Sequence, residues 1–185
     1  RAGGGGGAAR PRGCVPGVAG AEGAGEGPQR RVRAGALTKL GRDNKGRGPV
    51  EGIVIAKLVA VSGVLTSLDI GWNDLDEQAT LSIVRAARQQ DKMTSLGLEG
   101  CGIGASGANE IAEYMRVSSV LTSLNLSENK LCGVDWRGDG AYTAEGINAI
   151  ANALRVNSVL TSLNLAGSPF GGGIGPEGAQ AIAEA

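Results

Sequence analysis

Val-Leu-Thr-Ser-Leu decides the fold of this chain, because it occurs three times, at residues 64–68, 120–124 and 159–163. A close copy, Met-Thr-Ser-Leu, occupies residues 93–96, and a weaker one, Leu-Thr-Lys-Leu, occupies residues 37–40. A short motif that returns along a chain of 185 residues is typical of proteins built from stacked repeats. The copies therefore define the units from which the fold is built.

The spacing of these copies is regular. We call the first Leu or Met of each copy its anchor, and successive anchors lie 28 residues apart, except for a last step of 39 residues. The anchors are Leu37, Leu65, Met93, Leu121 and Leu160. A period of this length indicates a solenoid, in which one unit cannot bury its apolar face alone and must stack on the next.

Each unit combines two apolar periods. The alternating pattern Leu-x-x-Leu-x-Ile at residues 65–70 predicts a short strand with one buried face. A second stripe, formed by Ile83, Val84 and Ala87, has the spacing of an amphipathic helix. Strands need about 4.8 Å of lateral space and helices about 10 Å, so the stack must curve. We therefore predict an α/β solenoid, a horseshoe arc with parallel strands on the concave face and helices on the convex face.

One polar position closes each unit, eight residues after its anchor; it holds Asn73, Cys101, Asn129 and Ser168. An Asn side chain donates and accepts hydrogen bonds, so it can satisfy the peptide groups of a buried turn, and a thiol does so more weakly. The resulting pattern, Leu-x-x-Leu-x-Leu-x-x-Asn/Cys over 28 residues, resembles the ribonuclease-inhibitor-like leucine-rich repeats. This resemblance implies a curved solenoid that binds proteins. The same repeat is shared by ribonuclease inhibitors, Ran-type GTPase-activating proteins and NOD-like receptors.

The chain is expected to have two parts. Residues 1–36 are rich in Gly, Ala and Arg and offer too little apolar surface to fold, so we expect a disordered leader, with a basic arm for nucleic acid or an acidic surface as the alternative. Residues 37–185 form the leucine-rich repeat domain, with units starting near the five anchors. Residues 1–47 carry a net charge of +7, whereas residues 48–185 carry −7. The start at Arg1, without Met, leads us to expect a fragment of a longer protein.

The first unit is expected to be a degenerate copy of the repeat. Arg42 stands where its strand should turn an apolar residue inward, so this strand is predicted to be damaged. Pro49 then starts a helix, since Pro is favoured at the first helical position. Ile53, Ala56 and Val59 are predicted to form the buried stripe of this helix.

Composition excludes several classes of function. The chain has no histidine, which removes Ser-His-Asp and Cys-His nucleophile systems and the usual zinc sites. Its aromatic content of 3% is too low for a base-stacking nucleic-acid surface, and no apolar run is long enough to span a membrane. Cys14, Cys101 and Cys132 are odd in number and widely spaced, which favours a reducing compartment over a disulfide framework. We predict a cytoplasmic monomer that uses no cofactor and no metal, and binds neither nucleic acid nor membrane.

The outward residues of the strands line the predicted concave face. Most of them are small, and the exceptions are Asp69, Trp72, Glu99 and Glu128. An exposed Trp beside carboxylates fits a protein partner with a basic surface. The alternative is a solvated face with the Trp covered by a neighbour. Acid–base catalysis by Glu99 and Glu128 is disfavoured, because the sequence shows no pocket, metal-ligand set or supporting partner for it.

The insertion at residues 134–142 is the most individual stretch, and long loops in compact domains are often functional. We predict that its residues Trp136, Arg137 and Tyr142 extend the binding surface along the rim. Its acidic residues suggest a calcium loop, but Arg137 stands at a ligand position and the final acid comes one place early. The alternative is a tolerated surface insertion.

Taken together, these patterns predict a non-enzymatic module that binds another protein through the concave and rim surfaces of a leucine-rich-repeat solenoid. The first alternative is a regulatory fragment of a larger protein, either a Ran-type GTPase activator or the sensor region of a NOD-like receptor. The second alternative is a partial repeat array without a partner, which would unfold with poor cooperativity.

Overall fold

The computed structural model describes residues 39–40, 48–73, 75–135, 137–167 and 173–185. Within these ranges strands and helices alternate along the chain. In order they are β1 (Lys39–Leu40), α2 (Pro49–Val61), β2 (Ser67–Asp69), α3 (Glu77–Gln90), β3 (Ser95–Gly97), α4 (Ala105–Val117), β4 (Ser123–Asn125), α5 (Glu145–Leu154), β5 (Ser162–Asn164) and α6 (Gly175–Ala183). Predictions that fall outside the described residues concern the leader at residues 1–36, Arg42, Trp136 and Ser168.

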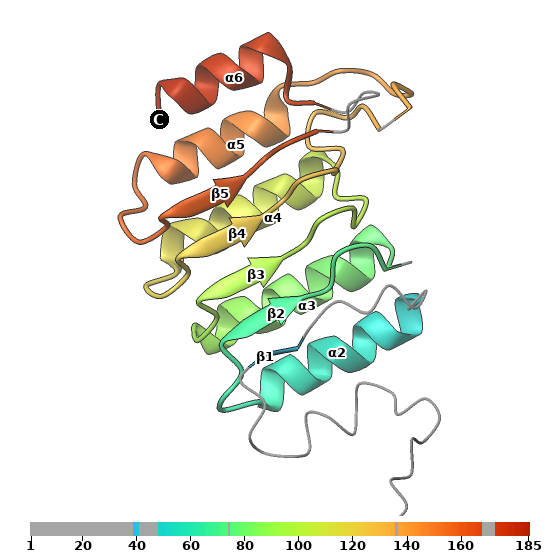
Figure 1. Ribbon diagram of the computed structural model, residues 1–185, viewed down its shortest axis with the longest axis vertical. Coiled ribbons are helices and arrows are strands. Elements are labelled where there is room, and N and C mark those ends of the chain that lie inside the picture. Colours follow the sequence, from blue (N-terminus) through green and yellow to red (C-terminus); the bar gives the residue numbers. More distant parts are fainter. Residues whose placement is uncertain (1–38, 41–47, 74, 136, 168–172) are drawn as a thin grey trace, which may run out of the picture.

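The five described strands form one parallel sheet in the order β1-β2-β3-β4-β5, so each strand pairs with the strand of the next unit. The register is constant, since Ser67, Ser95, Ser123 and Ser162 are successive partners. The helices form a second layer on one side of the sheet, which leaves the other face of the strands open (Figure 1). This arrangement confirms the predicted α/β solenoid.

The threonine of the repeated motif explains why the units keep this register. The hydroxyl groups of Thr94, Thr122 and Thr161 each donate a 3.0 Å hydrogen bond to the carbonyl of the corresponding threonine one unit earlier. Their amides donate to the same carbonyls at 2.7 to 2.9 Å. Each threonine therefore fixes its unit on the preceding one with two donors, which a residue without a hydroxyl cannot supply.

The leucines of the motif and the helix stripes form the core. Leu68, Leu96 and Leu124, one on each central strand, are at most 1% exposed. Ile83 on α3 and Ile111 on α4 are fully buried against them. Burial of apolar side chains contributes about 25 cal/mol per Å², so this shared core supplies the main driving force for stacking. The predicted strand alternation and helix stripe are confirmed in these units.

Helix α2 departs from the predicted stripe. It begins at Pro49 as expected, but Ile53 is 49% exposed whereas Ile55 is 1% exposed, so the prediction for Ile53 is wrong. The helix is apolar on nearly every side, and its sequence offers no contrast that fixes the inward face. The face is instead fixed by close packing at Gly52, where an added Cβ would lie 2.6 Å from the Cβ of Ala79 on α3.

The closing side chains Asn73 and Asn129 satisfy carbonyls of their own turns, as predicted, and Asn129 and Cys101 also bond to the preceding unit, which was not predicted. Asn129 Oδ1 accepts hydrogen bonds from the amides of Cys101 (3.1 Å) and Ile103 (3.0 Å), and Asn129 Nδ2 donates to the Leu98 carbonyl at 2.8 Å. Cys101 occupies the equivalent place one unit earlier, where its Sγ lies 3.7 Å from the Ile70 carbonyl oxygen. The thiol makes the same bridge as the amide but with a weaker donor.

Candidate protein-binding surfaces

The Asp69 carboxylate at the end of β2 is positioned by two glycines. Its Oδ1 accepts a hydrogen bond of 3.1 Å from the amide of Gly71. The carboxylate also extends over Gly97 on the neighbouring strand β3, where an added Cβ would stand 2.6 Å from Oδ1. Gly97 therefore provides the space in which Asp69 lies on the open strand face.

Trp72 packs on the next unit in a similar way. Its ring lies against Gly100, where an added Cβ would stand 2.8 Å from Trp72 Cε3. The Trp72 amide donates a 2.8 Å hydrogen bond to the Glu99 carbonyl, and the residue stays 41% exposed. Its φ is 55°, a left-handed conformation that costs a residue with a Cβ about 1–2 kcal/mol. The prediction that Trp72 offers an aromatic surface to solvent agrees with this geometry.

The position of Trp72 recurs in the next two units. Trp72, Gly100 and Glu128 have φ values of 55°, 61° and 58°, so the turns after β2, β3 and β4 place a left-handed residue at the same position. Glu128 stands two strands away from Trp72, about 10 Å at the usual strand spacing. Glu99 approaches Gly71, where an added Cβ would lie 3.2 Å from Glu99 Cβ. The structure thus brings Asp69, Trp72 and Glu99 together and places Glu128 further along the same face.

The strand segments that carry these carboxylates contain no basic residue. From β2 to β5, neither the strands nor the three residues after each strand include Lys or Arg. The exposed arginines of the described residues lie elsewhere: Arg85, Arg88 and Arg116 are on helices, Arg155 follows α5, and Arg137 is in the insertion. The formal charges within these strand segments are therefore those of Asp69, Glu99 and Glu128.

The insertion between β4 and α5 has a narrow neck. The Thr143 amide donates a 2.9 Å hydrogen bond to the Cys132 carbonyl and closes the neck. Gly133 and Gly140 make this closure possible, since a Cβ added to Gly140 would stand only 2.1 Å from the Gly133 carbonyl oxygen. The sequence analysis did not use these two glycines, although glycine is the residue that permits such a close approach of two backbone segments.

The tip of this loop is held by one carboxylate. Asp135 Oδ1 accepts hydrogen bonds from the amides of Arg137 (2.9 Å) and Asp139 (3.0 Å), and its Oδ2 lies 4.0 Å from Lys130 Nζ. The Asp139 amide contributes most to holding the pKa of Asp135 below its usual value. Asp135 thus serves as an internal cap of the loop, and the Arg137 side chain is exposed on the outer side.

Tyr142 connects the loop to the following helix. Its hydroxyl donates a 3.1 Å hydrogen bond to the Ile174 carbonyl, and its ring packs on Gly175, where an added Cβ would lie 2.9 Å from Cε2. Tyr142 remains 43% exposed. Its intramolecular contact with α6 was not part of the prediction, so only the exposed part of the ring is available on the rim.

The two described cysteines have the chemistry of core thiols. Burial is the main cause that raises the pKa of Cys101 to about 12, and burial also raises the pKa of Cys132. Neither side chain supplies a thiolate near neutral pH. Across the described ranges, no group of three or more His, Cys, Asp or Glu side chains is arranged to hold a metal ion. In the same ranges no helix is both long and apolar enough to cross a membrane.

Comparisons with known proteins agree with this architecture. Residues 156–183 match the family model described as Leucine Rich repeat. The fold is similar to a solved structure of the leiomodin-1 actin-binding site 2, with a TM-score of 0.63, 16% sequence identity, and coverage of 84% of this chain and 86% of that chain. It is also similar to the tropomodulin C-terminal domain from Caenorhabditis elegans, with a TM-score of 0.64, 9% identity and coverage of 84% and 86%. No curated protein sequence matches the chain. The fold is therefore that of a leucine-rich-repeat solenoid.

Proposed function

We propose that this protein is a non-enzymatic, intracellular protein-interaction module of the ribonuclease-inhibitor-like leucine-rich-repeat type, with residues 37–185 as its repeat domain. Its open strand face binds a basic surface of another protein, and Asp69, Trp72, Glu99 and Glu128 make the central contacts. Trp136, Arg137 and Tyr142 extend the contact along the rim.

The observation that carries this proposal is the exposed ring of Trp72. The chain holds this ring 41% exposed, on a backbone with φ of 55°, although a glycine occupies the same position without strain one unit later. Glu128 has the same backbone conformation, so the strain belongs to the repeated turn, and the exposed indole ring is the feature that a gain on binding would account for. The neighbouring carboxylates then select a cationic partner, because Arg stacks on indole rings and pairs with carboxylates.

The test compares partner capture by the full chain with capture by a Trp72→Ala/Glu99→Arg/Glu128→Arg variant. The matched control is Glu51→Arg/Glu113→Arg, which reverses two exposed carboxylates on the helix layer. We expect the parent and the control to retain the same basic proteins from a lysate, in a salt-sensitive manner, and the strand-face variant to lose them. Circular dichroism establishes that all three fold alike. Equal capture by the strand-face variant would refute the proposal.

Actin is a defined protein to include in this experiment, since the similar structure is the actin-binding site 2 of leiomodin-1. Retention of purified actin by the parent and its loss in the strand-face variant would identify the partner directly. Retention by both would place an actin contact elsewhere and would leave the strand face without support.

A further inference from the structure

An arginine-rich segment precedes β1 in the sequence. Three of the four residues 30–33 are arginines, and they lie outside the described residues. The strand segments from β2 to β5 contain Asp69, Glu99 and Glu128 but neither Lys nor Arg. These two parts of the same chain are therefore complementary in charge, which favours and orients a contact between them.

This segment is tethered close to the strand face. Six to nine residue steps separate residues 30–33 from Lys39 at the start of β1, which an extended chain spans in about 20 to 30 Å. Lys39 pairs with Ser67, so β2 and β3 lie about 5 and 10 Å from β1. Trp72 stands five residues beyond Ser67, about 17 Å along the strand direction. The arginines are therefore close enough in the chain to reach the surface around Trp72.

The chemistry of this surface suits arginine. The ring of Trp72 lies against Gly100 and remains 41% exposed. The Asp69 carboxylate beside it is positioned by the 3.1 Å hydrogen bond from the Gly71 amide to Oδ1. A guanidinium group stacks on an indole ring and pairs with carboxylates through its N–H groups at the same time. An arginine in this place therefore uses both features of the face.

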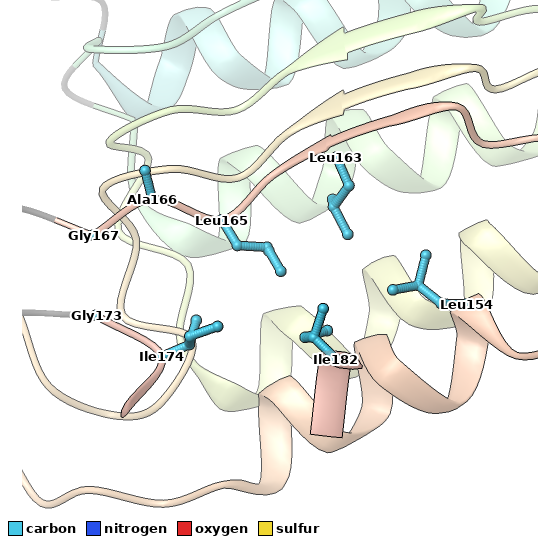
Figure 2. A pocket seen from close by; sticks show the side chains of 8 residues that line it. All are labelled: Leu154, Leu163, Leu165, Ala166, Gly167, Gly173, Ile174 and Ile182. Atoms are coloured by element: carbon cyan, nitrogen blue, oxygen red, sulfur yellow. The ribbon is translucent and has the colours of Figure 1, made fainter. Parts of the chain in front are cut away.

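The apolar cavity at the other end of the sheet does not suit this segment. The cavity has a volume of about 620 Å³ and lies between β5 and α6, where Leu163 and Leu165 point toward Ile182 (Figure 2). The described residues that line it are all apolar, so they offer no carboxylate to a guanidinium group. It also borders β5, the strand furthest from β1 in the sheet order. Charge and distance therefore both favour the strand face.

We propose that residues 30–33 bind the strand face of the same chain and cover Trp72, so that this segment competes with the partner protein. The inference rests on the proposed function, because it uses the same face. An arginine of the segment stacks on Trp72, and its neighbours pair with Asp69 and Glu99. A short tether gives an effective concentration in about the millimolar range, so an external basic partner must displace the segment to bind.

The first experiment measures the accessibility of Trp72 in the full chain. The leader variant is Arg30→Gln/Arg31→Gln/Arg33→Gln, and it is compared with the parent in a Trp136→Phe background. We expect acrylamide to quench Trp72 fluorescence at least about twofold more strongly in the leader variant at low salt, because no guanidinium covers the ring. The difference should disappear at about 0.5 M NaCl, where ion pairs between exposed groups are screened.

The matched control is Arg1→Gln/Arg10→Gln/Arg12→Gln, which removes the same charge from a more distant part of the leader. It should behave as the parent, since effective concentration falls with the length of the tether. Equal quenching in the parent and the leader variant overturns the proposal, and so does the same increase in the control. Quenching in the parent that depends on protein concentration would place the segment on a second copy and would also overturn it.

A peptide with the sequence of residues 28–36, Pro-Gln-Arg-Arg-Val-Arg-Ala-Gly-Ala, gives an independent check. It should bind the leader variant at least about tenfold more tightly than the parent, whose own segment occupies the face. Adding the three strand-face substitutions to the leader variant should abolish this binding. No binding to the leader variant, or equal binding to the parent, contradicts the proposal.

The two proposals fail in different ways, because the quenching and peptide experiments need no external partner. Absence of the peptide contact, with lysate capture that still depends on the strand face, would refute the competing segment alone. Peptide binding at the strand face, with equal lysate capture by the strand-face variant, would refute the proposed function alone.

Discussion

The units that begin with β4 and β5 contain the same pentapeptide but differ in how far their leucines are buried by neighbouring units. In the first, Leu121 and Leu124 are each 1% exposed, while the corresponding Leu160 and Leu163 are only partly buried. Both sets of residues have the same backbone pairing with the preceding strand. In a stacked-repeat protein, a residue's contribution to stability is therefore decided by the two flanking units more than by its own sequence.

The largest expected effect tests this difference directly. Leu124→Ala should lower the free energy of unfolding by about 2 to 5 kcal/mol, because it removes a fully buried side chain and leaves a cavity. Leu163→Ala should cost only about 1 kcal/mol, because part of that side chain already contacts water. Urea unfolding of both variants measures the two values. Equal losses would show that the unit of β5 is as well covered as its neighbour.

A second prediction concerns the turn after β3, where Gly100 and Gly102 both have positive φ. Gly100→Ala and Gly102→Ala both introduce a Cβ at positive φ, and each should lose about 1 kcal/mol of stability for that reason. Only the Cβ at residue 100 meets the Trp72 ring, since a Cβ at residue 102 has no heavy atom within 4 Å. Gly100→Ala should therefore shift Trp72 fluorescence in a Trp136→Phe background, and Gly102→Ala should not. A shift in both would mean that the turn, and not the ring contact, is perturbed.

The smallest expected effect concerns the loops that precede the strands. Asp91 accepts hydrogen bonds from the hydroxyls of Ser118 (2.7 Å) and Ser119 (2.8 Å), whereas the next such loop is held by the neutral Asn157. Burial raises the pKa of Asp91, but the bonds from Ser118 and Ser119 outweigh it and leave the pKa below its usual value.

Because the folded-state pKa is lowered, the Asp91 contribution is present above about pH 4 and is lost as pH falls through the folded-state value. Asp91→Asn should lower stability at neutral pH by less than about 1 kcal/mol, and the difference from the parent should shrink below pH 4. Urea midpoints measured across this range check the sign. A difference that grows toward acid pH would contradict it.

The fold was predictable because its signals are periodic. The leucine alternation, the helix stripe and the Asn/Cys position each recur at a fixed interval, so one unit confirms another. The exception was α2, where Ile53 and Ile55 are equally apolar and a contact at Gly52 decides between them. That contact involves a residue of the next unit, and no local pattern contains it.

The candidate surface was predictable only in part. Asp69, Trp72 and Glu99 stand out in the sequence as large side chains among small ones, and the structure brings them together. Their support by glycines was missed, because Gly97 and Gly100 belong to the following unit. A comparison of each large residue with the residue 28 positions later would have indicated it. The contact of Tyr142 with Gly175 follows no period, because it joins two irregular segments.

The neck formed by Gly133 and Gly140 has a consequence for how the chain can change. The spacing between the paired residues of β4 and β5 is 39 instead of 28, yet their register is the same as in the shorter units. Closing a longer loop costs little, about 0.6 kcal/mol for each doubling of its length. The connection therefore tolerates insertion: new sequence can be placed between the two glycines while the pairing of β4 with β5 stays the same.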